Sequence, residues 1–359
     1  MGVGRFAFTP LLPMMQEDAG LSVADGSWLA SANYAGYLLG ALTAIRMRVR
    51  PVTAIRASLL VIGLATLAMG LQRHLALWIV LRAVAGIASA WVLIFVSTWA
   101  LERLAQLGRS GMSGTVYAGV GTGIAAAGAG CLLLMSVHSA SNNAWIYLGF
   151  ASLVVTAGIW PFLKPNPPPQ TAEAALSASG GREFWRLVFC YGGFGFGYII
   201  PATFLPAMAK EVVPDPRLFG WAWPAFGAAA LASTLFVPRV KRFMTIRAVW
   251  ISGSLVMALG VVVPLVVPGL AGIMGAAICV GGTFMVVTMA GMEEARRVAG
   301  PRARTLMAAM TSAFALGQIV GPLSVSVLAG PKGGYAQALI VAAAVLVVSS
   351  FALMRRNRG

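Results

Sequence analysis

The chain has 359 residues, of which 59% are hydrophobic and only 10% are charged, and its mean hydropathy is +0.84. This composition excludes an ordinary soluble domain and indicates a polytopic all-α membrane protein. The net charge of +16 would suggest a nucleic-acid partner on a soluble surface, but the Lys and Arg residues cluster in short loops between apolar runs. We therefore expect the lipid bilayer, and no nucleic acid, as the partner of the basic residues.

The first stretch of the chain is repeated about halfway along it. Residues 2–15 match residues 195–208 at a constant offset of 193, as from Pro13 to Pro206. The same offset pairs Trp28 with Trp221 and Arg46 with Arg239. The chain is therefore predicted to consist of two related halves.

Apolar runs predict twelve transmembrane helices arranged as two pseudo-symmetric six-helix bundles. The predicted spans are residues 1–15, 28–45, 54–71, 76–101, 114–137, 144–163, 184–208, 218–237, 248–267, 270–291, 305–328 and 335–354. Residues 16–25 are predicted to form a polar loop. The first span of 15 residues would be roughly 22 Å long, shorter than the ~30 Å hydrocarbon core, so we expect this helix to be truncated at its start.

Residues 164–183 contain Pro165 and the run of prolines at 167–169, which no membrane span would carry. We interpret them as a flexible cytoplasmic connector. The predicted organisation is an N-terminal six-helix bundle (1–163), the connector (164–183) and a C-terminal six-helix bundle (184–359). Lys and Arg residues are concentrated in the loops after the even-numbered spans. By the positive-inside rule, both termini are cytoplasmic if the first helix is complete.

Two arginines, Arg5 and Arg82, lie inside predicted spans, whereas all ten Asp and Glu residues lie in loops or at helix ends. A charged side chain in the hydrocarbon core costs at least ~2.5 kcal/mol and usually faces a cavity or a partner. Arg5 is expected near the bilayer midplane, where transporters built from repeats bind their substrates. Two alternatives remain open. These cations bind an anionic or zwitterionic solute, or they are structural. In the structural alternative Arg5 hydrogen-bonds backbone carbonyls freed by Pro10 and Pro13 or holds tyrosines in place, and Arg82 braces helix packing.

Other polar side chains are candidates for the same cavity. The repeat places Tyr198 opposite Arg5, which makes Tyr198 the strongest candidate. Each candidate could instead be an interhelical hydrogen-bonding group. The predicted substrate-binding residues are Arg5, Tyr34, Tyr37, Arg82, Tyr117, Tyr191, Tyr198, Thr203 and Gln318.

The predicted site contains no catalytic residue, metal or cofactor. Cys131, Cys190 and Cys279 each lie in an apolar run and are interpreted as packing residues. His74 and His138 lie at the ends of spans, apart in sequence. No nucleophile and base, or set of metal ligands, is predicted inside the membrane, so an enzyme is not expected.

Local motifs resemble the major facilitator superfamily. Residues 79–86, with Arg82 and Gly86, resemble its fourth-helix motif, although Ala85 replaces the usual Gln. Residues 40–44, running into Arg48, resemble its second-helix loop motif, with Ala44 where the family normally has Asp. Residues 317–322 resemble an antiporter motif but lie in the eleventh span, so they do not establish antiport. The resemblance implies gating loops after the second and eighth spans, which contain Arg46, Arg48, Arg239 and Lys241.

A narrower resemblance, to the YbfB/YjiJ group, rests on residues 4–6 and 10–15 together with residues 195–206. It implies a secondary transporter of the bacterial inner membrane that moves a small organic solute by alternating access. Proton coupling is expected for the family. Because the spans contain no Asp or Glu, uniport and coupling through protonation of the substrate both stay open. The alternative is a membrane sensor or assembly factor that uses a transporter fold without transporting.

Overall fold

The computed structural model describes the chain except for residues 166–180, 213–219, 329–335 and 355–359, and its described residues form helices and no strands. The N-terminal half consists of α1 (Gly2–Phe6), α2 (Phe8–Asp18), α3 (Val23–Arg46), α4 (Pro51–Leu71), α5 (Leu75–Gln106), α6 (Ser113–Ser136) and α7 (Ser141–Ile159), with 3₁₀ turns at Ser110–Met112 and Trp160–Phe162. The C-terminal half consists of α8 (Gly181–Val212), α10 (Ala222–Val240), α11 (Ile246–Val266), α12 (Leu270–Ala299), α13 (Ala303–Leu328) and α14 (Ala336–Met354), with a 3₁₀ turn at Gly300–Arg302.

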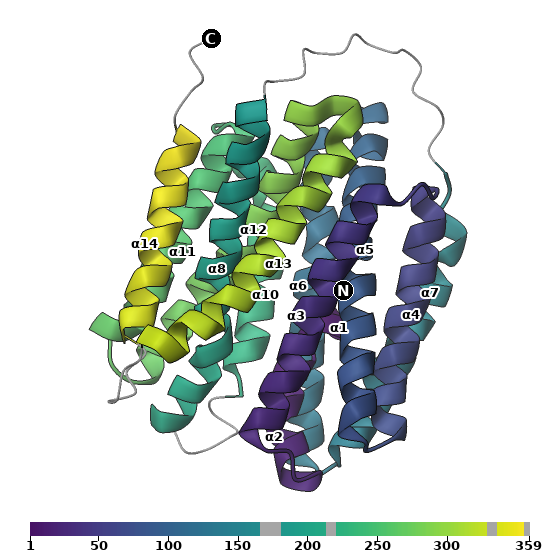
Figure 1. Cartoon of the computed structure of the whole chain (residues 1–359), viewed down its shortest axis with the longest axis vertical. Coiled ribbons are helices and arrows are strands. Elements are labelled where there is room, and N and C mark those ends of the chain that lie inside the picture. Colours follow the sequence, from purple (N-terminus) through teal and green to yellow (C-terminus); the bar gives the residue numbers. More distant parts are fainter. Residues whose placement is uncertain (166–180, 213–219, 329–335, 355–359) are drawn as a thin grey trace.

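The two groups of helices form bundles that stand side by side, with α3 and α13 meeting between them (Figure 1). The first membrane helix is formed by α1 and α2 together, because Ala7 between them keeps helical dihedral angles and its N–H bonds to the Val3 carbonyl at 2.9 Å. The N-terminal end of the chain lies at mid-height in the bundle (Figure 1).

The predicted loop at residues 16–25 is wrong at both ends. Helix α2 continues to Asp18, and α3 begins at Val23. Ser22 and Asp25 form a capping box in which the Asp25 N–H donates to the Ser22 hydroxyl at 3.1 Å, and this cap explains the early start of α3. Only the short segment between these helices is therefore a loop.

Several other helices extend beyond their apolar runs because polar residues continue them outside the hydrophobic stretch. Helix α5 reaches Gln106 and α12 reaches Ala299. Helix α8 begins at Gly181, so residues 181–183 are helical and do not belong to the connector predicted there. The connector prediction otherwise falls mainly on residues 166–180, which lie outside the described residues.

Seven described stretches are long and apolar enough to cross a membrane, and one of them, Leu270–Leu323, contains both α12 and α13. Helices α4, α7, α11 and α14 pack on the outer sides of the two bundles, where large apolar side chains such as Phe150 and Val155 are exposed. The first helix (α1 and α2), α3, α8 and α10 are not among these seven stretches.

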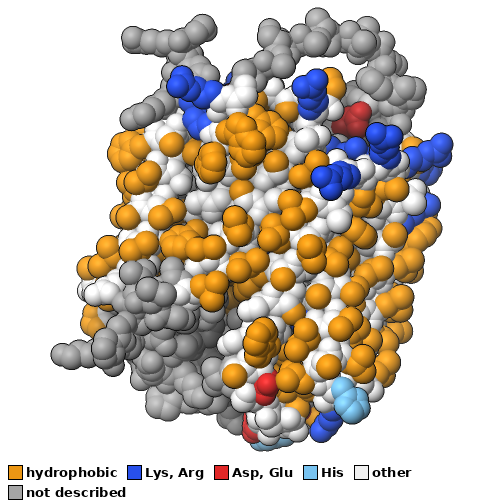
Figure 2. All heavy atoms as spheres, viewed as in Figure 1, with side chains coloured by type: hydrophobic (Ala, Val, Ile, Leu, Met, Phe, Trp, Pro, Cys, Tyr) orange, Lys and Arg blue, Asp and Glu red, His pale blue; other side chains and the backbone are white. Residues whose placement is uncertain are grey.

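Charge is distributed unevenly between the two ends of the bundle. Figure 2 shows apolar side chains over the middle of the molecule, most of the visible Lys and Arg at its upper end, acidic side chains at both ends, and His at its lower end. We call the upper end the basic end; it includes the exposed Arg46, Arg48 and Arg239. We call the lower end the opposite end; it includes Glu17 and His138.

The halves touch mainly along two seams, between α3 and α13 and between α6 and α10. Glycines bring the backbones of α6 and α10 together. A Cβ atom at Gly114 would lie 2.0 Å from the Thr234 carbonyl oxygen, and one at Gly121 would lie 2.5 Å from the Leu231 nitrogen. Only residues without a side chain permit this approach, which is typical of helix packing in membranes.

Candidate functional site

Arg5 lies in α1 at the boundary between the two halves and is 5% exposed. Its guanidinium donates a hydrogen bond to the side-chain carbonyl of Gln318 on α13. It also lies over the ring of Tyr37 on α3, 3.8 Å from the centroid, a distance typical of a strong cation–π contact. One charged side chain therefore contacts both halves of the protein.

Arg82 is 3% exposed and reaches from α5 to the first helix. Its guanidinium donates to the backbone carbonyls of Gly4, at 3.2 Å, and Arg5, at 3.4 Å, and lies 4.7 Å from the centroid of Phe8. These carbonyls lie at the end of α1, just before its junction with α2. This geometry fits the bracing alternative for Arg82.

A cavity of about 30 Å³ lies beside these two arginines. Arg5, Tyr34, Arg82, Tyr198 and Gln318 of the predicted set line it, and none of its described lining residues is acidic.

Most of the wall of this cavity comes from pairs of residues that the 193-residue repeat relates. The pairs are Arg5 with Tyr198, Phe6 with Ile199, Thr9 with Ala202, and Ala30 with Trp223. A site formed by equivalent positions of two repeats lies on the pseudo-symmetry axis between them, where repeat-built transporters place their substrates.

An aromatic layer separates the cavity from the basic end. Tyr198 stacks on Phe284 of α12, with centroids 4.3 Å apart and planes inclined by 13°. Phe194, one turn nearer the basic end on α8, lies 5.1 Å from Phe314 of α13. These rings fill the space through which a solute would have to pass toward that end.

The other predicted site residues lie around the cavity or between it and the basic end. Tyr37 contacts Arg5 without lining the cavity, and Thr203 is exposed and hydrogen-bonds Tyr34. Tyr191 lies within the aromatic layer and hydrogen-bonds Thr288. Tyr117 donates to the Ser97 hydroxyl at 2.8 Å, nearer the basic end. The tyrosines were predicted to share one cavity because of their chemical type. In the structure they lie at different depths along their helices, so they do not all line it.

The sequence analysis did not single out Trp223, which lines the cavity from the start of α10. Its ring stacks on Phe226, with centroids 5.2 Å apart. The repeat relates Trp223 to Ala30 in the second predicted span, but Ala30 was not a candidate either, so the repeat alone gave no signal for Trp223.

The halves are packed together at the basic end. The Ser113 hydroxyl on α6 contacts the Met289 sulfur on α12 at 3.6 Å, and the Thr98 hydroxyl on α5 contacts the Met307 sulfur on α13 at the same distance. Lys241 bonds to Glu293 at 2.8 Å and also reaches the Ser110 carbonyl of the other half at 3.4 Å. Among the four residues predicted for gating loops, Lys241 thus bridges the halves, while Arg46, Arg48 and Arg239 are exposed.

A second charged cluster holds the C-terminal half together. The carboxylate of Glu294, fully buried on α12, accepts bonds at 2.8 Å from Arg247 on α11 and from Arg297 one turn further along α12. Arg247 also pairs with Glu183 at the start of α8. A buried carboxylate is tolerated only when it is paired in this way. Three helices of this half are therefore linked at the basic end.

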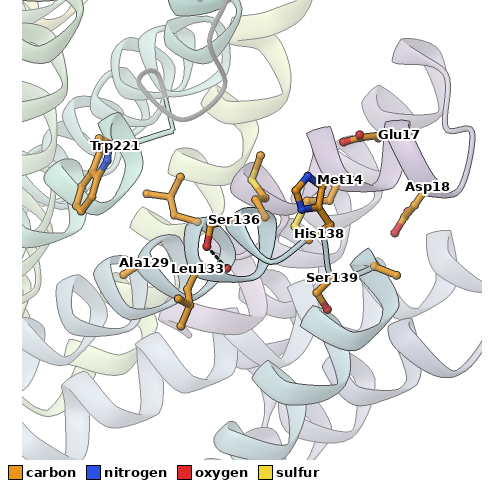
Figure 3. Close-up of a pocket in the computed structure, with 12 residues that line it drawn as sticks. Met14, Glu17, Asp18, Ala129, Leu133, Ser136, His138, Ser139 and Trp221 are labelled. Atoms are coloured by element: carbon orange, nitrogen blue, oxygen red, sulfur yellow. Dashed lines mark hydrogen bonds between the residues drawn. The ribbon is translucent and has the colours of Figure 1, made fainter.

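A larger cavity, of about 650 Å³, opens at the opposite end (Figure 3). Met14 and His138 lie between Glu17 and Asp18 on one side and Trp221 on the other. Asp18 is engaged, since it accepts bonds from the Ser141 N–H and hydroxyl and so caps the start of α7. Among the described residues, this cavity shares no lining residue with the central one and is lined by no Lys or Arg, so the central cavity is the stronger candidate site.

Comparison with solved structures identifies the architecture. The crystal structure of the human organic anion transporter MFSD10 (TETRAN) superposes with a TM-score of 0.71, covering 97% of this chain and 89% of that one at 12% sequence identity. At this identity the likeness shows the fold alone, which is that of the major facilitator superfamily. A search of curated proteins finds no match to the sequence.

The sequence itself matches one family over nearly its whole length. The family described as "Uncharacterised MFS-type transporter YbfB" covers residues 1–354. This match and the helical architecture confirm the resemblance seen in the motifs. The chain therefore belongs to the YbfB family of the major facilitator superfamily and is a multi-pass membrane transporter.

Proposed function

We propose that this protein is a secondary transporter that moves a small organic anion or zwitterion by alternating access. The observation that carries the proposal is the position of Arg5, a buried cation that contacts both halves and lines a cavity whose described wall contains no acid. Such a cation favours an anionic group through charge-assisted hydrogen bonds. MFSD10, which has the same fold, is described as an organic anion transporter, and this is consistent with the assignment.

The packing of the halves supports a cycle in which they rock against each other. A cavity of about 30 Å³ is far smaller than the ~300–1,000 Å³ of typical small-molecule sites, so a solute can enter only when the halves separate. The contacts of Ser113, Thr98 and Lys241 at the basic end must break for release on that side. Residues 1–163 and 184–359 are the proposed moving units, joined by the connector.

We assign the basic end to the cytoplasm of a bacterial inner membrane by the positive-inside rule. The C-terminus would then lie on that side, and the N-terminus would lie there too if the first helix is complete. Because the described lining of the cavity lacks Asp, Glu and His, the protein offers no evident proton carrier there. Proton coupling would then run through the acid group of the solute itself, and uniport is the alternative.

The test is ligand-induced thermal stabilisation of the purified protein across anionic, zwitterionic, neutral and cationic metabolites. Arg5→Ala and Arg5→Lys are measured in parallel, and Arg103→Ala, an exposed arginine at the end of α5, is the control. We expect anionic or zwitterionic compounds to stabilise the wild type and the control, and to lose their effect on Arg5→Ala. Stabilisation by neutral or cationic compounds alone, or an unchanged effect on Arg5→Ala, would show that Arg5 is structural.

A further inference from the structure

Four side chains around the central cavity each have a buried donor atom without a hydrogen-bond partner among the described residues. The atoms are Nε of Arg5, Nε of Arg82, Nε2 of Gln318 and Nε1 of Trp223. The four residues are all at least nine-tenths buried. A buried polar atom without a partner is unfavourable by roughly 1–3 kcal/mol, so four around one cavity require an explanation.

The contacts that these four side chains make with their neighbours use their other atoms and leave the four donor atoms without a partner. Arg5 uses its Nη2 atom on Gln318 and one face of its guanidinium on Tyr37. Arg82 uses both terminal nitrogens on two carbonyls of the first helix. The Gln318 oxygen is taken by Arg5, which leaves the amide nitrogen. The Trp223 ring stacks on Phe226, which leaves the indole N–H.

All four free atoms are donors, and two belong to guanidinium groups. A ligand group that satisfies them must offer several acceptor lone pairs, negative charge and no donor of its own. An ionised carboxylate has two oxygens, about four acceptor sites and no hydrogen, and so fits this set.

We propose that the central cavity is a carboxylate site in which the indole N–H of Trp223 is a substrate donor beside Arg5, Arg82 and Gln318. This inference rests on the proposed function and narrows its substrate to organic carboxylates. Trp223 brings a donor from the C-terminal half, and Arg5 and Arg82 bring theirs from the N-terminal half. The carboxylate would therefore be held between the two moving units.

The rest of the solute would meet aromatic surface. Phe8 and Tyr34 line the cavity on the side of the N-terminal half, and Tyr198 and Trp223 line it on the other. Ring faces favour a flat or apolar body over a heavily hydroxylated one, because the described walls offer few further polar groups. The expected substrate is a small carboxylate with a planar apolar body.

The experiment uses pairs of compounds that have the same body and differ only in the acid group. Equilibrium binding of benzoate and indole-3-acetate to the purified protein is compared with that of benzamide and indole-3-acetamide, and phenyl phosphate represents the other anion class. The variants are Trp223→Phe, which removes the N–H and keeps a ring, and Trp145→Phe as the matched control. Trp145 is also buried, but its N–H donates to the Met15 sulfur and it does not line the cavity. Thermal unfolding of each variant verifies folding.

We expect the acids to bind and the amides not to, with Trp223→Phe weakening acid binding about tenfold, as for loss of one hydrogen bond to a charged group, and Trp145→Phe leaving it unchanged. Equal binding of acids and amides, equal effects of the two variants, or preference for phenyl phosphate would overturn the carboxylate site. Absence of binding by every acid would also overturn it. The proposed transport function is tested separately, by whether any anionic or zwitterionic metabolite stabilises the wild type and loses this effect in Arg5→Ala.

Discussion

The Arg5 guanidinium donates to the Gln318 side-chain carbonyl across 313 residues of sequence. This bond joins the first helix to α13, so it crosses the boundary between the halves at the depth of the central cavity. Because Gln318 is neutral, the bond does not balance the positive charge of Arg5, and no described lining residue of the cavity is acidic.

Changing Gln318 to glutamate should neutralise the positive charge of Arg5 while keeping the hydrogen bond between the two side chains. In Gln318→Glu the new carboxylate pairs with Arg5, so we expect anion binding to fall by at least tenfold, about 1.4 kcal/mol, without a lower unfolding temperature. Binding assays and thermal unfolding check this. Gln318→Asn, which adds no charge, is the control and should weaken binding less. Unchanged anion affinity in Gln318→Glu would place the ligand away from Arg5.

Arg82 should contribute to stability through the first helix. Arg82→Met removes two bonds from a charged group to the Gly4 and Arg5 carbonyls, and we expect it to lower the free energy of unfolding by about 2 kcal/mol. Arg82→Lys should recover only part of the lost free energy of unfolding, because an ammonium group lacks the planar fork that reaches two carbonyls at once. Thermal unfolding measures both, with the exposed Arg103→Met as a control. A full recovery by lysine would mean that charge alone matters.

The close seam between α6 and α10 predicts a specific effect of one methyl group. In Gly114→Ala the new Cβ would meet the Thr234 carbonyl, so the halves cannot close fully near the basic end. A cysteine at Thr98, in a variant without the three native cysteines, should then react several-fold faster with a thiol reagent. Gly119→Ala on the same helix is the control, because a Cβ there meets nothing within 4 Å. Equal rates in the two variants would show that the seam does not govern access.

Lys241 should hold the basic end closed. Lys241→Met removes its bonds to Glu293 and to the Ser110 carbonyl. For a partly exposed contact of about 1 kcal/mol, we expect labelling of the Thr98 cysteine to rise about fivefold. Arg239→Met, two residues away and exposed, should leave the rate unchanged. If Arg239→Met has the same effect, general loss of positive charge is responsible rather than the Lys241 contacts.

The fold was predictable because apolar runs long enough to span a bilayer have few alternatives. The ends of the helices were not predictable in this way, because the predicted spans were defined by apolar runs and the helices continue beyond those runs through Glu17, Asp18 and Glu294. Within the site, the repeat pointed to Arg5 and Tyr198, both of which line the cavity. Trp223 was missed because a tryptophan near a helix end is also typical of the membrane interface, and only packing shows which way it faces.

The two guanidinium groups beside the cavity also have an electrical consequence. In the proposed cycle the site faces first one side of the membrane and then the other, so its net charge moves through the transmembrane potential. Moving one elementary charge across 100 mV corresponds to about 2.3 kcal/mol. The empty site carries the charge of Arg5 and Arg82, and a bound anion cancels part of it. Voltage should therefore act more strongly on the empty carrier than on the loaded one, and should draw the empty site toward the negative side.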